Sequence, residues 1–187
     1  ALRRGVEAFS AEVLPRLRRA FGREASPGVD GDPRIHILHH QPIAGVAGYY
    51  YSVDQQPRAV DPHSNAREMF YINLDSFTPG SRDYLALLAH EFQHMVHWNQ
   101  DPSESVWLNE GLSELAPHLV GLGVQTGRLY LGRPDTPLLE WTGDSGSSAE
   151  HYAAAFAFCA YLWQRYGEAY LAELLGQQAN GAAAVEA

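Results

Sequence analysis

Apolar residues recur at helical spacing near the start of the chain. Val6, Phe9 and Val13 lie on one face of a segment that spans residues 2–21, with arginines on the other side. Pro15 lies inside this segment and has no backbone N–H to donate. We therefore expect a helix that is kinked or divided into two pieces at the proline.

The next part of the chain has the pattern of short strands. Residues 34–38 alternate polar and apolar side chains, residues 45–52 combine glycine with β-prone tyrosine, and residues 68–74 are mostly apolar. The intervening residues 22–33 and 54–66 are rich in turn-forming and polar residues, so we expect loops there. These segments predict a small sheet in the N-terminal half.

The apolar period returns to that of helices from residue 82 onward, with Ser81 as the expected N-cap. Residues 101–103 break the pattern, and residues 121–147 are predicted to be loop. The fold class is therefore predicted to be α+β, with a small N-terminal sheet and a helical C-terminal part. The expected helices span residues 82–98, 106–119, 148–166 and 168–175, and a further helix starts near residue 182.

Length and charge limit what the chain can be. Its 187 residues, 45% of them hydrophobic, suit one compact domain over residues 1–187, divided at about residue 80 into helix plus sheet and a helical part. The net charge of −9 argues against a nucleic-acid partner. No apolar stretch reaches the roughly 20 residues of a transmembrane helix. Because the chain begins at Ala1, we expect a fragment of a longer protein.

Two features that suggest chemistry are interpreted as structural. Cys159 is the only cysteine, which excludes an internal disulfide, and its apolar helical surroundings predict a buried, inert thiol. Asp30 and Asp32 resemble part of a calcium loop, but the later ligands are absent, so we predict an ordinary turn.

The segment from His90 to His94 has the residues of a metal site. On a helix, residues four apart are offset by about 40°, so both imidazoles point the same way and can bind one Zn²⁺. Glu91 can reach a metal-bound water without binding the metal, and it can accept the water's proton during attack on a carbonyl. The pair of histidines is short enough to arise by chance, so a third ligand is decisive.

That third ligand lies on the next predicted helix. Glu110 follows His94 across the break at residues 101–103, which allows two helices to bring these side chains together. Glu114 lies one turn further and can accept a hydrogen bond from the far nitrogen of a ligand histidine. An exposed acidic face is the alternative interpretation of the two glutamates.

At these positions the sequence resembles the gluzincin zinc peptidases, the thermolysin-like and aminopeptidase-like groups. Their pattern of H-E-x-x-H, followed on a later helix by N-E-x-x-S-D/E, matches residues 90–94 and 109–114. The resemblance implies a zincin-like fold and zinc as the cofactor. The residues that it singles out are the ligands His90, His94 and Glu110, the general base Glu91, and the supporting residues Glu114, which partners His90, and Asn109.

The run from residue 68 to 167 also resembles bacterial hyicolysin-like peptidases. This resemblance implies a peptide or protein substrate and a secreted or cell-envelope location. The N-terminal helix shows none of the resemblance.

His97 is the rival third ligand, because metzincins use three histidines. On one straight helix His97 lies about 10 Å along the axis from His90, too far to share a tetrahedral ion. Metzincins overcome this distance with a glycine turn, and no glycine occurs between His90 and Gly111.

Peptide hydrolysis also needs a donor for the developing oxyanion and a surface that holds the substrate. Tyr152 is the first candidate donor and the adjacent His151 the second, with an ordinary core tyrosine as the alternative. The segment that contains Gly48, Tyr49 and Tyr50 occupies the place of the edge strand that pairs with an extended peptide. It has no glutamate comparable with the amine-binding residue of aminopeptidases, which favours internal cleavage.

The sequence thus predicts a zinc-dependent peptidase in which Glu91 activates zinc-bound water, acting as an endopeptidase. Two alternatives remain open. One is a zinc-containing module that binds peptides or proteins without cleaving them, and the other is a metzincin-type protease that uses His97.

Overall fold

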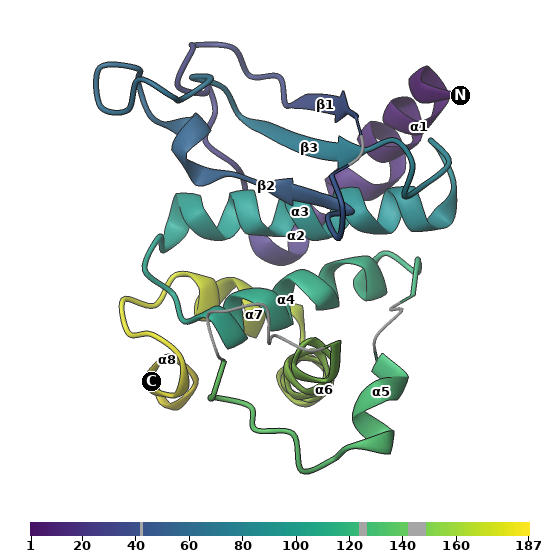
Figure 1. Ribbon diagram of the computed structural model, residues 1–187. Coiled ribbons are helices and arrows are strands. Elements are labelled where there is room, and N and C mark those ends of the chain that lie inside the picture. Colours follow the sequence, from purple (N-terminus) through teal and green to yellow (C-terminus); the bar gives the residue numbers. More distant parts are fainter. Residues whose placement is uncertain (42, 124–126, 142–148) are drawn as a thin grey trace.

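The computed structural model describes residues 1–41, 43–123, 127–141 and 149–187, and its architecture is α+β, as predicted. A three-stranded sheet has the order β1-β3-β2 and packs over the long helix α3 (Figure 1). The central strand β3 (Met69–Asn73) is parallel to β1 (His36–His40) and antiparallel to β2 (Gly48–Tyr50). β3 is buried along its whole length, which explains why its residues are almost all apolar.

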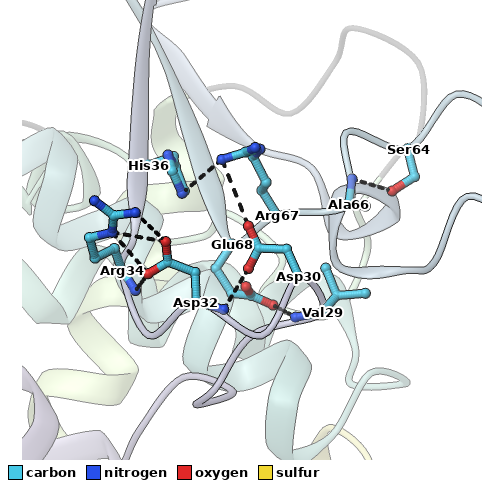
Figure 2. Close-up of polar contacts among 9 residues, drawn as sticks. All are labelled: Val29, Asp30, Asp32, Arg34, His36, Ser64, Ala66, Arg67 and Glu68. Atoms are coloured by element: carbon cyan, nitrogen blue, oxygen red, sulfur yellow. Dashed lines mark hydrogen bonds and ion pairs between the residues drawn. The ribbon is translucent and has the colours of Figure 1, made fainter.

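The strands are shorter than predicted or shifted. β1 begins two residues later than expected, since Arg34 is engaged with Asp32 in the preceding turn. In the same loop Asp30 lies 3.7 Å from Arg67, and Figure 2 shows both aspartates facing arginines. The carboxylate of Glu68 accepts the backbone N–H of Val29 at 3.1 Å. The turn predicted at residues 30–32 is therefore held by arginines.

The N-terminal helix is divided at the expected place. An α-helix, α1 (Leu2–Ala8), is followed by a π-helical turn, η1 (Phe9–Val13), and then by α2 (Leu14–Phe21), with Pro15 in its first turn. The wider π turn comes just before Pro15, which cannot donate a backbone hydrogen bond, and the chain stays helical through the proline. It also turns Phe9 toward the core, where its ring meets Phe70 and Phe92 edge-on.

Two helices hold the residues of interest. α3 (Arg82–Gln100) begins at the predicted cap, where the Ser81 hydroxyl accepts the N–H of Tyr84 at 3.2 Å, and it extends two residues beyond the predicted end. α4 (Val106–Leu119) has the predicted bounds. Figure 1 shows α4 running below α3, on the side away from the sheet. Both helices bury apolar side chains in a core that also includes α2, α6 and α7.

The C-terminal helices are α5 (Gly127–Gly132), α6 (Ala149–Tyr166), α7 (Glu168–Leu175) and α8 (Ala182–Glu186). The prediction of loop throughout residues 121–147 is wrong for α5, which packs against α6; residues 124–126 and 142–148 of that stretch lie outside the described residues. α5 is too short to show an apolar period. None of the described helices has the length and apolar character that crossing a bilayer requires.

The contact between α4 and α6 depends on Gly111. A Cβ at this position would lie 2.7 Å from the sulfur of Cys159 and 2.8 Å from the main-chain oxygen of Ala155. Cys159 is fully buried, as predicted, and burial raises the pKa of its thiol. Only glycine therefore allows α4 to approach α6 this closely.

We predict that Gly111→Ala destabilises the fold by about 1–3 kcal/mol, because a backbone oxygen cannot move aside as a flexible side chain can. The better helix propensity of alanine offsets only about 1 kcal/mol of this cost. Thermal unfolding should show a melting temperature lower by about 2–4 °C per kcal/mol.

Gly132→Ala is the matched control, since nothing lies within 4 Å of a Cβ at that position. An unchanged melting temperature in Gly111→Ala would show that the two helices are not in close contact there.

Candidate metal centre

Three side chains from two helices converge below β2. His90 and His94 lie one turn apart on α3, and their Nε2 atoms are 3.0 Å apart. The Oε2 atom of Glu110, on α4, lies 3.5 Å from Nε2 of His90 and 3.4 Å from Nε2 of His94. Among the described residues, these three form a group of ligand atoms that all lie within 4.8 Å of one another.

The spacing of the three atoms fits a tetrahedral ion. Zinc bonds of about 2.0–2.1 Å to nitrogen and oxygen place neighbouring ligands of a tetrahedron about 3.3 Å apart. Oε2 of Glu110 is buried and has no hydrogen-bond partner among the described residues. A buried carboxylate oxygen that is directed at two imidazole nitrogens is well suited to a shared cation.

The far nitrogens of both histidines are also held. Nδ1 of His90 lies 3.5 Å from Oε1 of Glu114, the partner that the sequence predicts. Nδ1 of His94 lies 2.5 Å from Oδ1 of Asn109 and 3.0 Å from Oγ of Ser113. These contacts at Nδ1 orient each ring so that Nε2 faces the common centre.

Charge and burial oppose each other in the site. Burial lowers the pKa of His90, but the carboxylates of Glu110 and Glu91 outweigh it and raise the pKa to about 9. Burial raises the pKa of Glu110, but the imidazoles of His94 and His90 outweigh it and hold the pKa well below its ordinary value. The imidazoles and the carboxylate of the donor group therefore stabilise one another's charged forms.

Glu91 lies beside this group and does not belong to it. It is 4% exposed, and the backbone N–H of Tyr50 on β2 faces its carboxylate. Burial raises its pKa, and the neighbouring His90 and His94 partly oppose that shift, as the N–H of Tyr50 does slightly. The carboxylate thus lies at the edge of the donor group and faces the strand above it.

Two adjoining cavities open on the donor group. One, of about 370 Å³, is lined by Asn109, Glu110 and the two histidines on one side and by β2 on the other. The second, of about 270 Å³, is lined by apolar residues of α3 and by Pro117. Four residues line both cavities: Gly48, His90, Glu91 and Tyr152.

The two predicted oxyanion donors, Tyr152 and His151, differ in whether they line the cavities. Tyr152 lines both cavities, and its ring meets Trp141 edge-on at 5.1 Å. Burial raises the pKa of its hydroxyl, with a further contribution from the carboxylate of Glu110. His151 also contacts Trp141, at 5.7 Å, and it lines neither cavity. Of the two, Tyr152 is the residue that faces the donor group.

The segment predicted to hold the substrate forms a strand beside the donor group. β2 is an edge strand, and Gly48, Tyr49 and Tyr50 all line the larger cavity. A Cβ at Gly48 would lie 2.8 Å from the side chain of Leu87, so this glycine lets the strand rest directly on α3. Tyr49 stacks on Tyr71 at 4.4 Å.

Sequence reasoning overlooked Gln93, matched Ser113 only as a position of the gluzincin pattern, and weighed His97 only as a rival metal ligand. His97 lies outside the donor group and is fully buried, with Nδ1 against Gln93. Gln93 and Ser113 are polar residues on otherwise apolar helix faces. That pattern was the available signal, because a buried polar side chain needs a partner.

No family model matches the chain. It is 26% identical to neutral metalloprotease ShpI of Staphylococcus hyicus over an alignment of 212 residues, which covers 96% of this chain. The chain spans 46% of the length of that relative. The relative is named as a metalloprotease, and this chain has a group of three side chains suited to a metal ion.

Proposed function

We propose that this chain is a zinc-dependent peptidase of the gluzincin type that cleaves within polypeptides. The observation that supports the proposal is the convergence of His90, His94 and Glu110 on one point, with Glu91 held beside them in a cavity. The similarity to a neutral metalloprotease over nearly the whole chain supports the same class of reaction.

The donor set supports zinc as the metal and the roles proposed for the neighbouring residues. Two imidazoles and one carboxylate are a known ligand set of catalytic zinc, which leaves a fourth position open. When bound, zinc polarises a peptide carbonyl and lowers the pKa of water to about 7. Glu91, buried and oriented by the N–H of Tyr50, accepts the proton of the attacking water and passes it to the leaving amine.

Tyr152 is the oxyanion donor in this proposal. A tyrosine hydroxyl is protonated at neutral pH, and burial raises the pKa of this one further, so the O–H is available to donate to developing negative charge. Trp141 packs against its ring and limits its rotation.

The edge of β2 is suited to hold an extended substrate. Since the N–H of Tyr50 points to Glu91, and alternate residues of a strand direct their backbone groups to the same side, those of Gly48 also face the cavity. A peptide can therefore add to this edge as a further strand. Two adjoining cavities along it accommodate chain on both sides of the cleaved bond, which favours internal cleavage.

We further propose that residues 1–187 act as one catalytic domain. Its support is the core, which joins the N-terminal helices, the sheet and the C-terminal helices in one cluster. The secreted or cell-envelope location inferred from sequence resemblance stays a prediction.

Glu91→Gln should retain zinc and lose peptidase activity, because the amide keeps the size of the side chain and cannot accept the proton. Zinc content by elemental analysis and turnover of casein and quenched peptides measure the two properties. Glu173→Gln, on the exposed side of α7, is the control and should retain both. Cleavage by Glu91→Gln at the wild-type rate would refute the role of Glu91, and a wild-type protein that binds zinc without turnover would favour the binding module.

Tyr152→Phe should lower kcat by about 100-fold with zinc content unchanged, since it removes one donor to the oxyanion. His151→Asn should leave kcat close to that of the wild type, because His151 lines neither cavity. The opposite result, with His151→Asn inactive and Tyr152→Phe active, would assign the donor to His151. Both variants are compared at saturating peptide concentration.

A further inference from the structure

A chain of buried polar side chains lies behind His94, between α3 and α4. Gln93 and His97 come from α3, Ser113 comes from α4, and all three are fully buried. None of them lines either cavity of the candidate site. Placing polar groups in the apolar contact between two helices is costly unless they bond to one another, so their arrangement calls for an explanation.

The hydrogen bonds of the chain are continuous. Oγ of Ser113 lies 3.0 Å from Nδ1 of His94 and donates to Oε1 of Gln93. Nε2 of Gln93 in turn donates to Nδ1 of His97 at 3.4 Å. The main-chain oxygen of Asn109 lies 3.0 Å from the same Ser113 hydroxyl.

The count of hydrogens fixes the direction of these bonds. A serine hydroxyl has one hydrogen, and both other neighbours of Ser113, the Gln93 amide oxygen and a main-chain oxygen, are acceptors. The hydrogen is committed to them, so Ser113 offers His94 a lone pair. Oδ1 of Asn109 is likewise an acceptor at Nδ1 of His94. The ring must therefore hold its hydrogen on Nδ1, which leaves Nε2 bare for a metal.

His97 holds the other end of the chain. Because its Nδ1 accepts from Gln93, its own hydrogen is on Nε2. Burial lowers the pKa of His97 to about 4, and His94 adds to this shift, so the ring is neutral near pH 7. In neutral His97, Nδ1 has no hydrogen and accepts one from the amide nitrogen of Gln93. This bond keeps the amide oxygen of Gln93 turned toward Ser113.

We infer that Gln93 and His97 are positioning residues for the metal ligand His94. Acting through Ser113, they keep an acceptor opposite Nδ1, and so they hold His94 in the form and orientation that binds metal through Nε2. This inference rests on the proposed function, because it assigns His94 as a zinc ligand. It gives the third histidine of α3 a role outside the metal's coordination.

The first test measures zinc affinity by competition with a chromophoric chelator. Gln93→Leu removes the side-chain acceptor of Ser113, which leaves only the main-chain oxygen of Asn109, and should weaken zinc binding about tenfold; His97→Leu should weaken it in the same direction. His97→Asn keeps an acceptor near the place of Nδ1 and should restore most of the affinity. Leu175→Ala, in the core away from the site, is the control: it should lower the melting temperature without changing zinc affinity.

Wild-type zinc affinity in both Gln93→Leu and His97→Leu would overturn the inference, as would equal losses in His97→Leu and His97→Asn. If the wild-type protein binds and uses zinc while these variants are unaffected, the inference fails and the proposed function stands. If the wild-type protein binds no zinc, the proposed function itself fails.

A second test needs no substitution. Nitrogen NMR of the wild-type protein with ¹⁵N-labelled histidine, near pH 7, reports which ring nitrogen of His97 holds the hydrogen, with or without zinc. The inference requires the hydrogen on Nε2 of His97. A hydrogen on Nδ1 would reverse the bond to Gln93 and contradict it.

Discussion

The candidate site depends on the close packing of α3 against α4. Two ligands come from one helix and the third from the other, so their spacing is set by how the helices pack and not by any loop. α4 is in turn held against α6 at Gly111, directly after Glu110 in the sequence. Because protein cores are close-packed, a shift of either contact would move the Glu110 carboxylate relative to both imidazoles.

The two histidines are supported by different groups. His90 lies next to the cavities and is backed by a charged carboxylate, that of Glu114, which strengthens the ligand as an electron donor. His94 also lines the larger cavity and is as exposed as His90, but it is backed by the neutral groups of Asn109 and Ser113. The strand β2 then completes the site from above, with the backbone N–H of Tyr50 facing Glu91 across the cavity.

The sequence was informative where chemistry follows from spacing along one element. Helical spacing placed His90 beside His94, the cap at Ser81 marked the start of α3, and the bounds of α4 were predicted fully. The sequence was less informative where contacts between elements decide the bounds of an element or the partner of a side chain. The shift of β1 results from the pairing of Arg34 with Asp32, and α5 is too short to show an apolar period. The link from His97 to His94 crosses between two helices, so no pattern along either one predicts it.

The central claim is that two imidazoles and one glutamate of this chain hold a single zinc ion. X-ray absorption at the zinc edge, on protein loaded with one equivalent of the metal, tests it most directly. The account predicts two imidazole nitrogens and oxygen ligands at about 2.0–2.1 Å in a four-coordinate shell. It further predicts that Glu110→Ala loses one oxygen ligand and that His97→Asn leaves the spectrum unchanged. A shell of three imidazoles, or a spectrum that Glu110→Ala does not change, would contradict it.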